Sequence, residues 1–145
     1  MTRIIGLDHG SRRIGVAVGD TETGMAFARP ALLRRNLVTD LAAIGELVAA
    51  EAVRLVVIGL PFNMDGTEGE QAAAARTFGE QVALSGIGVV YEDERLSSWE
   101  AGERLSEAGR QPRRERGELD SAAARVILQQ YLDARRRTAA LEETE

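Results

Sequence analysis

The stretch IIGLDHGSRRIGVAVGD, residues Ile4–Asp20, decides how the fold begins. Two apolar runs, Arg3–Leu7 and Ile14–Val18, have the composition of β-strands, and the Gly-rich basic turn Asp8–Arg13 joins them. So short a connection makes the two strands antiparallel neighbours. The hairpin also sets a carboxylate, Asp8, where its first apolar strand ends. The hairpin alone does not show whether Asp8 is a turn residue or part of a functional site, so the rest of the sequence has to be considered.

Strand and helix patterns alternate after the hairpin. We expect three strands: a weaker one near Phe27–Arg34, one in RLVVIGLP and one in IGVVYEDERL. We expect a first helix from Asp40, capped by Thr39 or Asp40, and a last helix over Leu119–Arg137. Between them we expect a helix to Leu84 that a Thr67/Glu70 capping box begins, and a helix to Ala108 that a Ser97/Glu100 capping box begins. Because β-α-β units give parallel strands, the pattern predicts an α/β fold with a mixed sheet of about five strands and helices on both faces.

Composition narrows the class of protein. The chain has 145 residues, the size of one domain, which we expect over residues 1–137, with a disordered acidic tail at 138–145. It has no cysteine, which excludes disulfides and thiolate metal sites. No apolar run approaches the roughly 20 residues of a membrane span, and a strand at the N-terminus leaves no room for a signal peptide. These features are typical of a cytoplasmic protein.

Charge is distributed unevenly along the chain. The net charge of −5 argues weakly against a nucleic-acid partner. Every cation is arginine, however, and arginines cluster at Arg12–Arg13, Arg34–Arg35, Arg110–Arg116 and Arg135–Arg137. Because the guanidinium fork matches phosphate oxygens, the arginine clusters are compatible with a phosphate-bearing ligand despite the negative net charge.

Acidic residues fall at one predicted edge of the sheet. Asp8 ends the first strand, Asp93 and Glu94 end the strand VVYEDE, and Asp120 begins the last helix on the apolar stripe of Ala124, Ile127, Tyr131 and Ala134. Ligand sites form at the carboxyl ends of parallel strands. Carboxylates gathered there repel one another, and Mg²⁺ or Mn²⁺ relieves that cost. Two such ions can stabilise both the attacking and the leaving oxygen of a phosphodiester. Since Asp93 and Glu94 point to opposite faces, only one joins Asp8 and Asp120, and strand alternation does not choose between them.

Each acid also has an ordinary structural interpretation. Asp8 resembles a turn residue, Glu94 could pair with Arg95 or Arg104, and Asp120 could cap its helix. His9, the one histidine, is read as a plain loop residue, and the arginine-rich loop as a solvated connection. The shared edge of the sheet nevertheless favours the metal site.

Four blocks of sequence carry a resemblance to a known family. GLDHGSRRIGVAVGD, VVIGLPFNMDGTEG, VVYEDERLSSWEA and LDSAAARVILQQYL resemble the YqgF/RuvX family of Holliday-junction-resolvase-like and pre-16S rRNA nucleases, in the family's order and over nearly the whole chain. The resemblance implies an RNase H-like fold and an Mg²⁺- or Mn²⁺-dependent nuclease with Asp8, Glu94 and Asp120 as catalytic ligands, Glu94 being preferred to Asp93. The expected nucleic-acid contacts are Arg12, Arg13, Asn63, Arg95, Arg110, Arg113, Arg114 and Arg116.

Two other functions compete with the nuclease. The DxGxxxxG pattern also opens the phosphate-binding hairpins of actin-like ATPases and sugar kinases, which need two such domains rather than one. A non-catalytic scaffold that binds nucleic acid would keep the fold alone, although three buried acids without a metal would be costly. The sequence does not separate RNA from DNA as substrate, because a site directed at phosphates reads few bases. Two coordinated cuts in a four-way junction would further require a homodimer.

Overall fold

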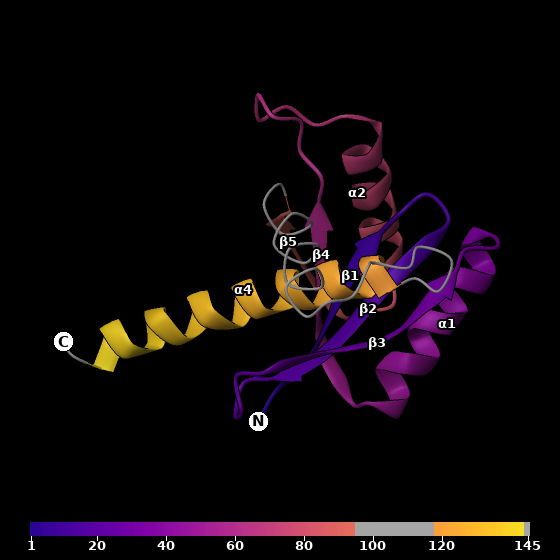
Figure 1. The fold of residues 1–145 in the computed structure, drawn as a ribbon. Helices are drawn as coiled ribbons and strands as arrows, with labels where there is room; N and C mark the ends of the chain where they lie inside the picture. The colour runs from indigo at the N-terminus through magenta and orange to yellow at the C-terminus, as the bar shows by residue number, and fades with distance from the viewer. Residues whose placement is uncertain (95–117, 144–145) are drawn as a thin grey trace.

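The computed structural model describes residues 1–94 and 118–143. Figure 1 shows its elements, which are β1 (Arg3–His9), β2 (Arg13–Asp20), β3 (Ala26–Leu33), α1 (Leu37–Ala50), β4 (Val53–Leu60), α2 (Glu70–Ala83), β5 (Gly88–Asp93) and α4 (Glu118–Glu143). The strands form one sheet in the order β3-β2-β1-β4-β5. β1 is antiparallel to β2 and parallel to β4, which is in turn parallel to β5. The expected mixed five-stranded sheet is confirmed.

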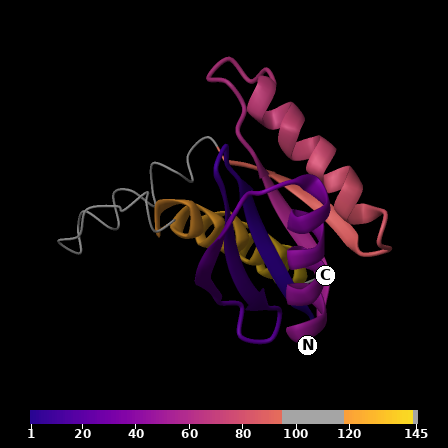
Figure 2. The ribbon, with the colours of Figure 1, turned by 90° about the vertical axis from the view of Figure 1, so that its right-hand side faces the viewer.

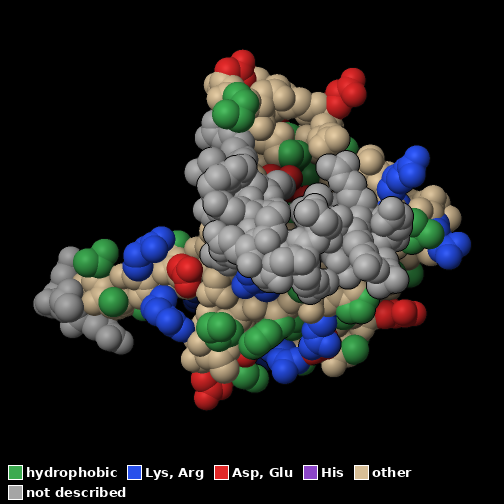
Figure 3. Space-filling view, viewed as in Figure 1, with side chains coloured by type: hydrophobic (Ala, Val, Ile, Leu, Met, Phe, Trp, Pro, Cys, Tyr) green, Lys and Arg blue, Asp and Glu red, His purple; other side chains and the backbone are tan. Residues whose placement is uncertain are grey.

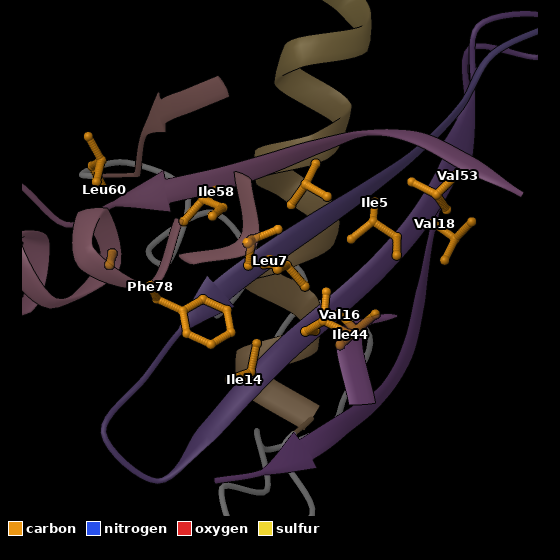
Figure 4. Packing of buried hydrophobic residues seen from close by; sticks show 13 residues of the cluster. Ile5, Leu7, Ile14, Val16, Val18, Ile44, Val53, Ile58, Leu60 and Phe78 are labelled. Carbon is orange, nitrogen blue, oxygen red and sulfur yellow. The ribbon is translucent and has the colours of Figure 1, made fainter. Parts of the chain in front are cut away.

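Helices cover both faces of this sheet, as Figure 2 shows from the side. On one face, Ile44 of α1 and Phe78 of α2 pack with strand residues such as Leu7 and Ile58, as Figure 4 shows. On the other face, α4 packs Ala124, Ile127, Leu128 and Leu132 against a smaller cluster that includes Ile4 and Val57. The apolar run of β4 is buried on both faces, which explains why it shows no alternation of polar and apolar residues.

α4 packs directly against the middle of β1. A Cβ atom on Gly6 would lie 2.8 Å from Cβ of Leu128 and 2.9 Å from the carbonyl oxygen of Ala124. Glycine is therefore required at position 6, because any side chain would push the helix away from the strand. The close approach sets the distance between α4 and β1 on this face of the sheet.

The helix starts differ from the sequence-based expectations. α1 begins at Leu37, and the side chain of Asn36 accepts a hydrogen bond of 2.8 Å from the Thr39 amide, so capping by Thr39 or Asp40 was a wrong prediction. Gly69 precedes α2 without a side-chain cap. The Thr67 hydroxyl instead donates to Asp65 inside the preceding turn, so the Thr67/Glu70 capping box is also wrong. At α2 a local turn uses the hydroxyl that the motif assigns to the helix, whereas at α1 the cap is Asn36, three residues before Thr39.

The last helix ends later than expected. α4 continues to Glu143 rather than stopping near Arg137, so residues 138–143 are helical and not a disordered tail. This stretch contains alanine, leucine and glutamate and no glycine or proline, which favours continuation of a helix. The expected helix begun by Ser97 and Glu100 lies outside the described residues. Among the helices that the structure describes, none is long and apolar enough to span a bilayer.

Candidate metal centre

Asp8 lies at the carboxyl end of β1 on the face that α4 covers. Ile4 belongs to the cluster beneath α4, and Gly6 contacts that helix directly. Since alternate residues of a strand share a face, Asp8 follows Ile4 and Gly6 on the same side. It is half-buried and is paired with Gly15 of β2, which adds no side chain beside it. The carboxylate therefore belongs to the regular strand rather than to the turn.

Glu94 reaches the same face from the other side of β4. It follows β5 directly, and its backbone amide donates to the Leu60 carbonyl oxygen at 3.1 Å. Its side chain is only 8% exposed. A Cβ atom on Gly59 would lie 2.2 Å from Oε2 of Glu94 and 2.5 Å from Cδ1 of Ile127 in α4. The Glu94 carboxylate thus lies over the bare backbone of Gly59, against α4.

Asp93 is directed to the opposite face. Val90 of β5 packs with the α4 cluster, whereas Val89 and Tyr91 pack with the cluster beneath α1 and α2. By alternation Asp93 shares the side of Val89 and Tyr91, and it is exposed. Strand alternation in the sequence left both acids open and the family resemblance preferred Glu94, which is the one whose carboxylate lies on the α4 face.

Asp8 and Glu94 meet across the β1–β4 pair. Leu7 is in register with Ile58, and the next residues of these parallel strands are Asp8 and Gly59. Neighbouring strands lie about 4.8 Å apart, so the carboxylate over Gly59 is next to the one on Asp8. Figure 3 shows acidic side-chain atoms recessed in this face of the molecule. Two oxygen donors in a partly dry recess repel each other and suit a hard divalent cation.

The backbone of Asp120 lies in the first turn of α4, one turn before Ala124. Its side chain lies outside the described part of the chain. Ser121 next to it is 4% exposed, and its hydroxyl donates to the Arg29 carbonyl oxygen at 2.7 Å and accepts from the Val16 amide at 3.5 Å. Ser121 thereby fastens the start of α4 to β2 and β3 at the height of Asp8. Sequence reasoning missed this residue, although a hydroxyl inside an apolar stripe was a usable signal.

Replacing Ser121 by alanine is expected to lower the free energy of unfolding by about 1 kcal/mol, because the part-buried hydrogen bond to Arg29 and the buried one from Val16 are lost. Urea denaturation followed by circular dichroism measures the change. Ser85→Ala is the matched control, because that hydroxyl donates to the Val82 carbonyl oxygen at the exposed end of α2. An equal or smaller loss for Ser121→Ala than for Ser85→Ala would contradict this role.

The turn between β1 and β2 is held in place by Arg34. Its guanidinium Nη1 donates to the carbonyl oxygens of Gly10 at 2.8 Å and Ser11 at 3.2 Å, and its amide donates to the Arg12 carbonyl oxygen at 2.8 Å. The turn carries Arg12, which is exposed, and leads to Arg13, the half-buried first residue of β2. Both arginines thus stand at the edge of the sheet that carries Asp8. The sequence placed Arg34 only in a cluster of arginines, because it is the pairing of β3 with β2 that brings this side chain to the turn.

His9 is not the loop residue that the sequence suggested. It ends β1, is 8% exposed, and stacks on Phe78 with ring centroids 4.7 Å apart. It lies on the α1 and α2 side of the sheet, away from the Asp8 carboxylate. Alternation along the strand sends the two neighbours to opposite faces.

Asn63 shapes the loop that follows β4. Its amide donates to the Thr67 carbonyl oxygen at 2.7 Å, and its Nδ2 donates to the Thr67 hydroxyl at 3.0 Å. Gly66 closes the turn with φ of 88° and donates to the Asn63 carbonyl oxygen. The other expected nucleic-acid contacts lie outside the described residues; they are Arg95, Arg110, Arg113, Arg114 and Arg116. The described residues contain no group of three or more metal-ligating side chains; Asp8 and Glu94 supply two carboxylates.

The chain matches one family model and many curated sequences. The model described as RuvX, Holliday junction resolvase, matches residues 2–134. A protein of Anaeromyxobacter dehalogenans named as a candidate pre-16S rRNA nuclease is 47% identical over 134 residues, covering 92% of this chain and 98% of its own length. One of the same name from Moorella thermoacetica is 46% identical, covering 90% of this chain and 94% of its own.

Solved structures share the fold. The Thermus thermophilus RuvC bound to a Holliday junction substrate matches with a TM-score of 0.58 and 16% identity, covering 93% of this chain and 96% of RuvC. The large terminase nuclease from the thermophilic phage G20c matches with a TM-score of 0.53 and 15% identity, covering 88% and 80% of the two chains. At this identity the likeness concerns the fold, and it confirms the RNase H-like architecture.

Proposed function

Because the chain belongs to the RuvX family, we propose that it is a nuclease that hydrolyses phosphodiester bonds and matures the 5′ end of pre-16S rRNA. The observation that carries the proposal is the buried Glu94 carboxylate over Gly59, beside Asp8 at the carboxyl end of β1. Two neighbouring carboxylates repel each other, and a divalent cation bound between them relieves that repulsion. The names of the curated relatives supply the RNA substrate.

Mg²⁺ or Mn²⁺ fits the donors that are present. Asp8 and Glu94 offer carboxylate oxygens, the ligands these hard cations prefer, and the chain has no cysteine to favour a softer metal. Asp120, in the first turn of α4, is the third proposed ligand. When bound, the metal supplies Lewis-acid stabilisation of charge on the phosphate oxygens.

The remaining residues of the proposed site position the substrate and the acids. Arg12 and Arg13, on the turn held by Arg34, bind the phosphates flanking the scissile bond. Gly59 leaves the space that the Glu94 carboxylate occupies. Arg95 and the arginines between 110 and 116 would extend the phosphate-binding surface. Because these contacts address the backbone, branched or single-stranded DNA is a further substrate class for the same chemistry.

We place this activity in the cytoplasm, where ribosomal RNA precursors of bacteria are processed. Paired cuts in a branched DNA would require a homodimer, because one chain offers one set of acids. Single cuts in an RNA precursor carry no such requirement. The oligomeric state in solution therefore separates the two substrate classes.

Metal binding is tested directly by thermal melting. We expect millimolar Mn²⁺ or Mg²⁺ to raise the Tm by about 5 °C or more, because a cation that binds only the folded state stabilises it by mass action. Asp8→Asn should abolish this shift while raising the Tm of the metal-free protein, since one of the repelling charges is removed. Differential scanning fluorimetry with and without EDTA provides the measurement.

Glu22→Gln is the control for the metal-dependent shift, because Glu22 is an exposed acid in the turn after β2. It should leave the shift intact. A Tm that responds neither to metal nor to Asp8→Asn would exclude the proposed site and favour a non-catalytic role.

A further inference from the structure

A second recess lies at the end of β1, on the opposite face of the sheet from Asp8. It is a hollow of about 300 Å³ between the start of α1 and α2, and its lining includes His9, Arg34, Asn36, Asp40, Thr77 and Phe78. Because His9 follows Asp8 directly in β1, the hollow and the proposed metal centre stand back to back across this strand. The proposed reaction makes no use of the hollow.

Two buried polar side chains belong to this hollow. Asp40 is 7% exposed, and its Oδ1 accepts a hydrogen bond of 3.0 Å from the Arg35 amide. Its Oδ2 accepts no hydrogen bond from the residues that the structure describes. His9 is 8% exposed, and burial, followed by the nearby Arg34 charge, lowers its pKa to about 4. The hollow thus contains a carboxylate acceptor beside a neutral imidazole.

Arg34 brings hydrogen-bond donors to the same place. Its Nη1 is held by the carbonyl oxygens of Gly10 and Ser11, which fixes the guanidinium at the rim. Its other guanidinium N–H groups make no hydrogen bond within the described part of the chain. A ligand in the hollow would therefore meet an acceptor on Asp40 and fixed donors on Arg34. The hollow would suit a ligand that offers donors on one edge and acceptors on the next.

We propose that this hollow binds a guanine base of the nucleic-acid substrate, an inference that rests on the proposed nuclease function. Guanine presents N–H donors on its Watson–Crick edge, which a carboxylate accepts, and the acceptors O6 and N7 beside them, which arginine reads. Adenine carries an amino donor in place of O6 and would oppose Arg34 with a second donor. The volume is sufficient for one base, and a pocket of this kind typically fixes its ligand with few polar groups.

The site would give the nuclease a sequence preference. The phosphates that Arg12 and Arg13 hold would lie at the turn after β1, next to both faces of that strand. A guanine bound beside His9 would then fix the register of the strand relative to Asp8. Specificity at one base would be added to a site that otherwise reads phosphates.

The single histidine makes the test direct. His9 is the only histidine of the chain, so its imidazole C–H resonances are one resolved NMR reporter inside the hollow. Metal-free protein is titrated separately with GMP, AMP, CMP and inorganic phosphate. We expect GMP to shift the His9 resonances saturably, with a Kd about tenfold below those of AMP and CMP. Inorganic phosphate should cause no comparable shift.

Asp40→Asn is expected to weaken GMP binding about tenfold. The asparagine retains an oxygen for the Arg35 amide, so the start of α1 is preserved, and a thermal melt verifies this. Glu46→Gln is the matched control, because Glu46 is an exposed acid on the same helix. It should bind GMP as the unmodified protein does.

Three outcomes would overturn the proposal. These are no shift of the His9 resonances with GMP, equal affinities for GMP and AMP, or a shift by inorganic phosphate equal to that by GMP. The last would identify an anion site in place of a base site. Because binding is measured without metal and without cleavage, a failure here leaves the nuclease proposal standing, and a success survives the failure of a cleavage assay.

Discussion

Asp8→Asn and Glu94→Gln are each expected to lower the rate constant for phosphodiester cleavage by about 10³-fold or more. Each substitution removes one of two carboxylates that share the α4 face of the sheet, and with it several kcal/mol of metal-borne stabilisation of charge in the transition state. Both variants are nearly isosteric, so the fold should be retained. Single-turnover cleavage of a labelled RNA carrying the 5′ leader of 16S rRNA, with Mn²⁺, measures the loss.

Asp93→Asn is the sharpest control for these two variants. Asp93 is the immediate neighbour of Glu94, but strand alternation sends it to the α2 side, where it is exposed. Its replacement should change the rate constant by less than about threefold, in keeping with an exposed position away from the site. Loss of cleavage in Asp93→Asn with retention in Glu94→Gln would reverse the choice between the two acids. A four-way DNA junction run in parallel distinguishes the substrate classes.

Gly59→Ala is expected to reduce cleavage by about 10²-fold, although it adds only one methyl group. The new Cβ atom would lie 2.2 Å from Oε2 of Glu94 and 2.5 Å from Cδ1 of Ile127, so the carboxylate or α4 has to move. A displacement of about 1 Å in a positioned catalytic group can cost about 10²-fold in rate. The same cleavage assay measures the effect, and urea denaturation measures the accompanying loss of stability.

Two other glycines separate the catalytic effect from simple overpacking. A Cβ atom on Gly79 would lie 2.4 Å from the Tyr91 hydroxyl, on the opposite face, so Gly79→Ala should destabilise the fold without impairing catalysis by the folded protein. Among the described residues, no atom lies within 4 Å of such a Cβ on Gly45 in α1, so Gly45→Ala should stabilise the protein by up to about 1 kcal/mol. If Gly79→Ala and Gly59→Ala impaired cleavage equally, the effect on Glu94 would not be specific.

The helix boundaries illustrate where local patterns fail. Capping motifs identified helix starts near α1 and α2, but the hydrogen bonds use Asn36 in one case and a turn around Asp65 in the other. A capping motif indicates which side chains can accept a hydrogen bond from a backbone amide, and competing local turns determine which of them do so. The residue at a boundary is therefore less predictable than the existence of the helix.

The amino-acid sequence by itself determined the order of the strands and helices that the structure describes, the mixed sheet, the family, and the arrival of Asp8 and one of two neighbouring acids at one edge. These follow from hydrophobic periodicity and from chain connections, which act over a few residues. Only the tertiary structure decided that Glu94 rather than Asp93 faces α4, that Gly59 must lack a side chain, and that Ser121 and Arg34 hold the elements around Asp8. It also decided that His9 and Asp40 share a hollow on the far face. These features depend on which face of the sheet each helix covers and how closely, and contacts between residues far apart in sequence fix both.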